Sequence, residues 1–210
     1  DYQPTQGITD DSIKIGTSGP TSGAYGAAFA PIRKGQQAYF DYVNAEKDGL
    51  GGRQIEFVGT DRDDEYQAAK TVTNVEQLIQ QDEVFALFNV LGTPNNLAFR
   101  DDLNEWCVPN LFVATGAVEW GETEAYPWLI GSLPSYATEA LVFSDYLKQN
   151  DPDATVAILY QNDDFGKGYV DAFEKSIEDS GITVVEARTY EPGDAEVSAQ
   201  MTALGATGAD

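Results

Sequence analysis

Short β-type runs alternate with helical patterns along the chain, and this order constrains the fold more than any other feature. Each run leads into a glycine-rich or polar loop, which is followed by apolar residues at spacings of three and four. Strands that alternate with helices in this way form a parallel sheet through right-handed crossovers. The sequence therefore predicts an α/β protein whose sheets are flanked by helices on both faces. The predicted strands cover residues 12–16, 54–59, 84–90, 110–113, 128–131, 155–160 and 183–190.

The predicted helices lie between these strands. In the first helix, a stripe of apolar or small residues recurs at helical spacing. The stripe consists of Ile32, Gly35, Tyr39, Tyr42 and Val43. Further helices are predicted around residues 68–79, 94–106, 140–147 and 169–180.

The alternation stops and then restarts in the second half of the chain. Residues 132–135 break the pattern, so we place a hinge crossing there. We expect a flexible N-terminal segment over residues 1–10, an N-terminal α/β lobe over 11–131 and a partial C-terminal α/β lobe over 136–210. Both lobes are predicted to be Rossmann-like. Only two strands of the second lobe can be recognised, so we interpret that lobe as incomplete and the chain as a fragment.

The charge balance excludes several classes of function. The 210 residues include 35 Asp or Glu and 12 Lys or Arg, which gives a net charge of −23, and the chain has no histidine. A field of this sign repels phosphate backbones and anionic lipids, so we expect no nucleic-acid partner and no binding to a membrane surface. Without histidine, the Ser-His-Asp and Cys-His catalytic systems cannot form. The only cysteine of the sequence is Cys107, and we interpret it as a buried small hydrophobic residue rather than as a reactive thiol.

Loops at the carboxyl ends of parallel strands are where ligands bind in open α/β sheets. This rule selects the loops 17–26, 91–95, 114–117 and 161–166. They contain small and hydroxyl residues, and two of them place an aromatic residue directly before glycine, as in Tyr25-Gly26 and Phe165-Gly166. Hydroxyl groups can hold a carboxylate while aromatic rings cover the apolar part of a small molecule. The loops predict a binding pocket without a catalyst.

Two acidic loops offer an alternative reading as metal sites. Asp61–Glu65 and Asn162–Asp164 could suggest calcium, but neither has the residue order of an EF-hand loop. We interpret both as solvated acidic loops and expect no metal and no cofactor.

Several short motifs, taken in order, give the chain a resemblance to a known family. From about residue 11 onward it resembles the type I periplasmic, or extracellular, solute-binding proteins of ABC transporters, in the branched-chain amino acid binding (Leu/Ile/Val-binding) branch. That resemblance implies two lobes joined by hinge strands, which close over a ligand in the cleft between them. The motifs are IKIG with SGP and YG after residue 12, GLGGRQI at 49–55, Asp61 with Ala68, VPNLFVATGA at 108–117, and LYQNDDFGKGY at 159–169.

The resemblance also implies roles for particular residues. Tyr25 matches an aromatic residue that lines the N-terminal lobe, and Thr93, in Leu91-Gly92-Thr93, matches the hydroxyl that takes the ligand carboxylate. Phe165 matches a Tyr or Phe from the second lobe. A further backbone-and-hydroxyl contact is matched by Ala114, Thr115 and Gly116.

Two departures leave the ligand open. The acidic residue that holds the ammonium group in amino-acid binders falls beyond Asp210. Some members of the family have a pair of cysteines that this chain lacks, and Asp64 and Gly92 stand near the positions where those cysteines would fall. The solute is therefore expected to be a branched-chain amino acid or an aromatic acid, organic acid or amide.

Each of these residues also has a purely structural interpretation. Tyr25 and Phe165 could be wedges between loop and helix, and Thr93 could be a helix N-cap followed by Pro94. Trp120 and Tyr136 are interpreted as packing residues near the hinge.

Three classes of function follow from these features. The first is a monomeric, extracytoplasmic transport receptor that delivers its solute to a membrane permease. Such a receptor would be made with a signal sequence, and lipid anchoring through a removed N-terminal segment is one option. The second is a sensory ligand-binding domain of the same fold. The third, an α/β enzyme, is disfavoured because the dinucleotide-binding, Walker and nucleophile-elbow motifs are absent from the sequence.

Overall fold

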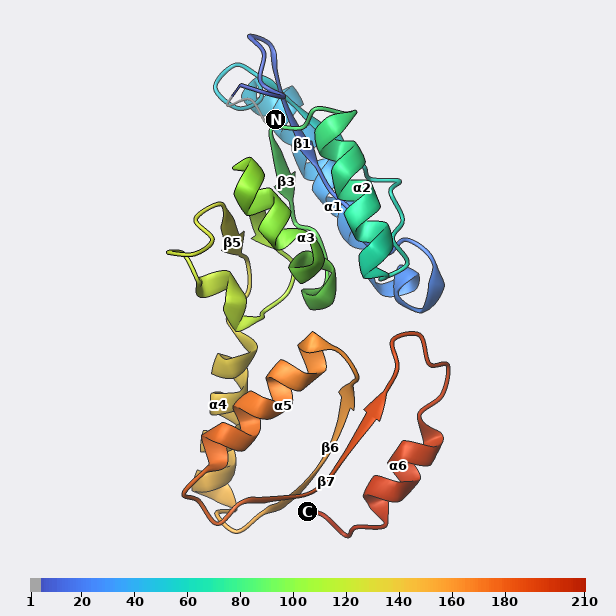
Figure 1. Cartoon of the computed structure of the whole chain (residues 1–210), viewed down its shortest axis with the longest axis vertical. Helices are drawn as coiled ribbons and strands as arrows, with labels where there is room; N and C mark the ends of the chain where they lie inside the picture. The colour runs from blue at the N-terminus through green and yellow to red at the C-terminus, as the bar shows by residue number, and fades with distance from the viewer. Residues whose placement is uncertain (1–4) are drawn as a thin grey trace. The chain divides into compact units, whose positions relative to one another are not determined.

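The computed structural model describes residues 5–210, and these form two compact units (Figure 1). The first unit holds the described residues up to Thr115 together with Glu119–Leu133. The second holds Gly116–Val118 and Pro134–Asp210. Residues 1–4 of the predicted flexible segment lie outside the described residues. Within the rest of that segment, the Gln6 side-chain amide donates to the Ile79 carbonyl at 2.9 Å, and the Gly7 carbonyl accepts from the Lys14 N–H at 2.7 Å.

The first unit is a five-stranded parallel sheet with strand order β2-β1-β3-β4-β5. Helices follow the first three strands, and a 3-10 turn, η1, precedes the last. The elements are β1 (Ser12–Gly16), α1 (Gly23–Lys47), β2 (Gln54–Val58), α2 (Ala68–Gln80), β3 (Ala86–Phe88), α3 (Thr93–Trp106), β4 (Asn110–Val113), η1 (Val118–Gly121) and β5 (Leu129–Gly131).

The two faces of this sheet pack against different helices. Successive side chains of a strand point to opposite faces. In β3, Leu87 joins the buried cluster under α2 and α3, with Leu78 and Phe99. Phe88 instead packs edge-on against Phe40 of α1, with ring centroids 5.3 Å apart. The alternation predicted from the sequence is confirmed as an α/β sheet covered on both faces.

The buried face of α1 does not coincide with the stripe whose spacing predicts the helix. Arg33 and Phe40 are buried, whereas Ile32, Tyr39 and Tyr42 of the stripe are 44%, 63% and 49% exposed. The spacing therefore predicts that a helix forms here, but it does not identify which side of the helix faces the core.

The second unit contains a two-stranded parallel sheet, β6 (Thr155–Gln161) beside β7 (Thr183–Tyr190). Its helices are α4 (Tyr136–Asn150), α5 (Asp164–Ile177) and α6 (Ser198–Gly205). Ala140 of α4 and Phe173 and Ile177 of α5 form the core of this unit. Helix α5 begins at Asp164, earlier than the predicted residue 169, because the Asp163 side chain accepts a hydrogen bond from the Gly166 N–H at 3.1 Å and caps the helix. Phe165 therefore lies on a helix rather than in a loop.

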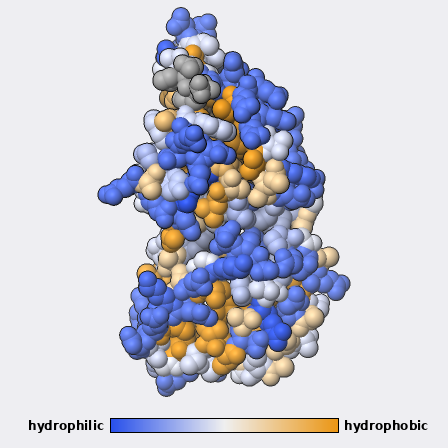
Figure 2. Space-filling view, in the orientation of Figure 1, coloured by the Kyte–Doolittle hydropathy of each residue, from blue (hydrophilic) through white to orange (hydrophobic). Residues whose placement is uncertain are grey.

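Two further findings concern the surface. Cys107 is exposed, because it ends α3 in a left-handed conformation with φ of 58°, so the expected burial of this thiol was wrong. Hydrophilic residues cover most of the face shown in Figure 2, with hydrophobic residues between them on both units. No helix within residues 5–210 has the length and apolar character needed to cross a membrane.

Candidate functional site

The strand order places a topological switch between β1 and β3. From β1 the chain continues to β2 on one side of the sheet, and from β3 it continues to β4 on the other side. At the carboxyl ends of β1 and β3, the loops that follow these strands therefore diverge, and ligands of open α/β sheets bind at such a point. Beyond β3 and β4, Leu91 forms a parallel bridge with Ala114, and the Ala114 N–H donates to the Val90 carbonyl at 3.0 Å. The structure thus brings the predicted loops 91–95 and 114–117 side by side.

A pair of threonine hydroxyls lies where these two loops meet. The Oγ1 atoms of Thr93 and Thr115 are 2.5 Å apart, and both residues are buried, with 1% and 3% exposure. Either oxygen can be the donor of this hydrogen bond. The N-cap of α3 is Gly92, so the alternative role of Thr93 as N-cap was wrong. Thr93 is instead the first helical residue, at the positive end of the α3 dipole.

Gly92 has a backbone that only glycine adopts easily. Its φ is 100°, and a Cβ built there would lie 2.4 Å from Oδ1 of Asn95 and 2.9 Å from Cε2 of Tyr66. Both contacts are too close for real atoms. Glycine at this position lets the chain turn into α3 and lets the Tyr66 ring lie directly against the backbone.

Tyr25 and Tyr66 form an aromatic pair in the same unit. Their ring centroids are 4.5 Å apart, and the rings are tilted by 33°. Tyr25 lies in the first turn of α1, which begins at Gly23, so its predicted place in the loop 17–26 was wrong. Tyr66 was missed, because the loop after β2 was interpreted only as a solvated acidic segment. The rule that selects loops at the carboxyl ends of strands would have found it.

In the acidic loop after β2, Asp61 and Glu65 are exposed but Asp64 is buried, so the prediction that this loop is solvated is wrong for Asp64. Asp64 is 0% exposed, and its Oδ2 accepts hydrogen bonds from the hydroxyls of Ser18 and Thr71, both at 3.0 Å. Burial raises the pKa of Asp64, although these hydrogen bonds and the charge of Arg33 act in the opposite direction. Burial also acts to raise the pKa of Asp63, but hydrogen bonds from the Ser22 hydroxyl and nearby backbone N–H groups outweigh it, so the pKa lies well below its ordinary value.

Arg33 is the buried cation beside this loop. Its Nη1 donates to the carbonyls of Thr60 and Arg62, both at 3.2 Å. Burial lowers the pKa of Arg33, while the neighbouring charge of Asp64 raises it in part. The guanidinium therefore ties the loop after β2 to α1. Sequence analysis missed it, because arginine is seldom buried.

The remaining predicted residues, Gly116 and Phe165, belong to the second unit. The Gly116 carbonyl accepts from the Tyr136 N–H at 2.6 Å. The Tyr136 ring packs at 5.0 Å from that of Phe165 and at 5.5 Å from that of Tyr169. Burial and the charge of Glu139, which accepts a hydrogen bond from the Tyr169 hydroxyl at 3.2 Å, raise the pKa of Tyr169 to about 12. Phe165 thus sits in a cluster of three rings, and its role as a ligand contact stays a prediction.

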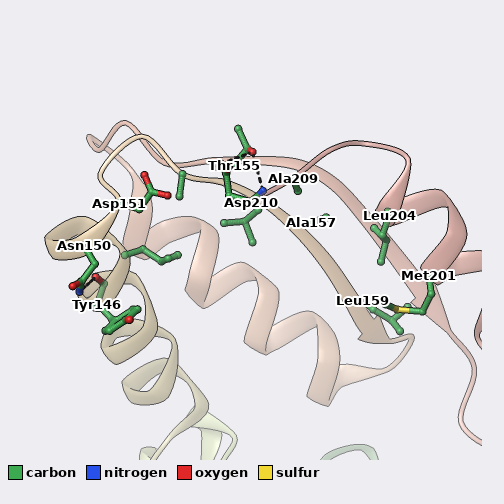
Figure 3. Close-up of a pocket in the computed structure, with 14 residues that line it drawn as sticks. Tyr146, Asn150, Asp151, Thr155, Ala157, Leu159, Met201, Leu204, Ala209 and Asp210 are labelled. Atoms are coloured by element: carbon green, nitrogen blue, oxygen red, sulfur yellow. Dashed lines mark hydrogen bonds between the residues drawn. The ribbon is translucent and has the colours of Figure 1, made fainter.

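A cavity in the second unit lies elsewhere, and none of the predicted site residues line it. It measures about 660 Å³ and follows the edge of β6 that β7 does not cover. Met201 and Leu204 of α6 border it on one side, and Tyr146 and Asn150 of α4 on the other (Figure 3). At one end of it, the Asp210 N–H donates to the Thr155 carbonyl at 3.1 Å. The cavity is a largely apolar groove along a strand edge rather than a polar binding site.

The described residues offer no evident metal centre. Within residues 5–210, no group of three or more Cys, Asp or Glu side chains is arranged to hold an ion. What the first unit does assemble is a buried hydroxyl pair at a helix N-terminus, next to two tyrosine rings. This arrangement can bind an anionic group, and its rings can cover the apolar part of the same molecule.

Comparison with known proteins identifies relatives of this chain and of its fold. The family model described as periplasmic binding protein matches residues 12–210. The Leu/Ile/Val-binding protein homolog 3 of Brucella melitensis biotype 1 is 27% identical over 94% of this chain and 52% of its own length. A substrate-binding periplasmic protein from Ralstonia solanacearum is 29% identical, with a TM-score of 0.83 over 95% of this chain and 54% of that one.

A solute-binding protein from R. palustris, solved in complex with benzoate, is 21% identical and has a TM-score of 0.82, covering 95% of this chain and 54% of that one. The chain thus spans about half the length of these proteins. The family match covers nearly all of the chain, and the strand order and the parallel sheets agree with it. The chain belongs to the periplasmic binding protein family, of type I and in the branched-chain amino acid binding branch.

Proposed function

We propose that the protein is the solute-binding receptor of an ABC transporter and that its first unit anchors the carboxylate of a small organic acid. The observation that carries this proposal is the buried pair of Thr93 and Thr115 hydroxyls at the N-terminus of α3. A hydroxyl group donates a strong, charge-assisted hydrogen bond to a carboxylate, and Thr93 carries its hydroxyl at this end of the helix. The first N–H groups of a helix have no partner within that helix, and they favour the same negative charge.

The aromatic rings supply the second part of the proposed recognition. Tyr25 lies beside Tyr66 near the hydroxyl pair, and we propose that Phe165 of the second unit covers the ligand from the other lobe. A ligand favours the closed arrangement of the lobes only by the difference between its binding free energies in the closed and the open arrangement. The family that matches this chain consists of binding proteins, so we propose a receptor and not an enzyme.

The wider role follows from the family. A named relative is a Leu/Ile/Val-binding protein homolog, and a structural neighbour holds benzoate. Branched-chain amino acids and aromatic acids share a carboxylate, so this group is the common feature that the hydroxyl pair can recognise. We propose that the protein works outside the cytoplasm as a monomer and presents its closed form to a membrane permease.

The experiment begins with a ligand screen. Thermal unfolding of the full-length protein is measured with amino acids and aromatic acids, because a ligand that binds only the folded state raises its apparent stability. If none of these acids raises the unfolding temperature, the proposed function is rejected for carboxylate solutes.

Variants at Thr93 then test the anchor with the acid that binds best. Thr93→Val keeps the shape and removes the hydroxyl, and it should weaken binding by about 1–3 kcal/mol in calorimetry because a charge-assisted hydrogen bond is lost. Thr93→Ser keeps the hydroxyl and is the matched control, with affinity close to that of the natural protein. Equal affinities for all three proteins would reject Thr93 as the anchor.

A further inference from the structure

The loop that carries Tyr66 is held in an uncommon backbone shape. Glu65 and Tyr66 have φ values of 49° and 62°, so two consecutive residues other than glycine lie in the left-handed region. This conformation costs energy for residues with a Cβ atom and persists only when the surroundings hold it. Here two carboxylates do so. Asp63 Oδ1 accepts from the Glu65 N–H at 3.0 Å, and Asp64 Oδ1 accepts from the Tyr66 N–H at 2.9 Å.

Asp64 is itself fixed from several elements. It is fully buried and accepts hydrogen bonds from the hydroxyl of Ser18, which follows β1, and from that of Thr71 in α2. Asn95 of α3 donates to the Thr71 hydroxyl at 2.7 Å. The position of the Tyr66 backbone is therefore tied to β1, α2 and α3 at once.

This loop places the Tyr66 ring next to the proposed carboxylate anchor. The ring centroid is 4.5 Å from that of Tyr25. On another side, a Cβ at Gly92 would come within 2.9 Å of Tyr66 Cε2, so the ring lies against the residue that directly precedes Thr93. All of these residues belong to the first unit.

The neighbouring acidic groups are unsuited to an ammonium ion. Asp63 already accepts from the Thr21 and Glu65 N–H groups and from the Ser22 hydroxyl, and Asp64 accepts from three internal donors. A carboxylate that is engaged in this way has little capacity left for a ligand cation. Asp63 and Asp64 are therefore engaged within the protein, and the groups that this part of the first unit offers to a ligand are the hydroxyl pair and two rings.

We propose that Tyr66 is a specificity-determining residue of the ligand site and that it favours a flat aromatic carboxylate over a branched aliphatic amino acid. This inference rests on the proposed function. A ring attached directly to a carboxylate lies beside Tyr66 when its acid group reaches the Thr93 and Thr115 hydroxyls. Aromatic rings gain from offset or tilted stacking, which a branched aliphatic side chain cannot reproduce.

The test compares two probes, benzoate and L-leucine, in calorimetric titrations of the full-length protein. The natural protein should bind benzoate more tightly. Tyr66→Ala should weaken benzoate binding by roughly tenfold and leucine binding by much less, so that the selectivity falls. Tyr66→Phe keeps the ring and should keep the selectivity. Tyr39→Ala, which removes a 63% exposed tyrosine of α1, is the control and should change neither affinity.

The outcomes separate this inference from the function on which it rests. A natural protein that prefers leucine, or a Tyr66→Ala variant whose selectivity matches that of Tyr39→Ala, overturns the role of Tyr66 while the receptor function stands. Equal losses for both probes in Tyr66→Ala also overturn it, because they indicate a collapsed loop. Binding of neither probe nor any screened acid rejects both proposals. Retained selectivity in Tyr66→Phe together with reduced selectivity in Tyr66→Ala supports the inference.

Discussion

Replacing Gly92 by alanine should destabilise the first unit and disturb the proposed anchor. With φ at 100°, alanine would occupy a region that costs about 1–3 kcal/mol for a residue with a Cβ atom. The new methyl group would also lie 2.4 Å from Oδ1 of Asn95, which is fully buried and donates to Thr71 at 2.7 Å. Moving Asn95 weakens that hydrogen bond by about 1 kcal/mol. We therefore expect Gly92→Ala to lower the free energy of unfolding by about 2–4 kcal/mol.

The measurement is urea unfolding followed by tryptophan emission. All three tryptophans, Trp106, Trp120 and Trp128, lie in the first unit, so the signal reports the unit that carries Gly92. Gly35→Ala is the matched control. Gly35 lies within α1 with no atom within 4 Å of a built Cβ, so alanine should stabilise the helix by about 0.5–1 kcal/mol. A Gly92→Ala protein within about 0.5 kcal/mol of the natural one would refute the reasoning.

Two further predictions concern single carboxylates. The folded pKa of Asp63 lies below its unfolded value, so its contribution to stability is present above about pH 4 and is lost as the pH falls further. Asp63→Asn should therefore lose less stability on acidification in urea titrations, and identical acid sensitivity would contradict this. Asp163→Ala removes the N-cap of α5 and should destabilise the second unit by about 0.5–2 kcal/mol, measured by circular dichroism. Asp164→Ala, at the next position, keeps the cap and should cost less; equal losses would argue against capping.

The elements and their order could be predicted because they depend on local patterns. Apolar alternation, helical spacing and glycine-rich breaks act over a few residues, and parallel strands joined by helices leave few topologies open. The loops at 91–95 and 114–117 were predicted on the same basis, and the bridge between Leu91 and Ala114 places them side by side. The start of α5 was predicted too late, because capping by Asp163 outweighs the glycines at 166 and 168.

The residues that were missed are those whose environment is made by distant parts of the chain. Asp64 reads as a solvated acid in its own segment, but Ser18, Thr71 and Arg33 surround it after folding. The Tyr66 N–H donates to the Asp64 carboxylate, so the placement of Tyr66 depends on that of Asp64. Such groups carry no periodic signal of their own.

By itself, the sequence determined that the chain forms parallel α/β units and that hydroxyl and aromatic residues follow particular strands, since both properties follow from short-range spacing. Only the tertiary structure decided which face of α1 is buried, that Thr93 bonds to Thr115 rather than capping its helix, and that Tyr66 joins Tyr25. The physical reason is that burial and hydrogen-bond pairing depend on which distant groups share a small volume, and chain folding alone brings those groups together.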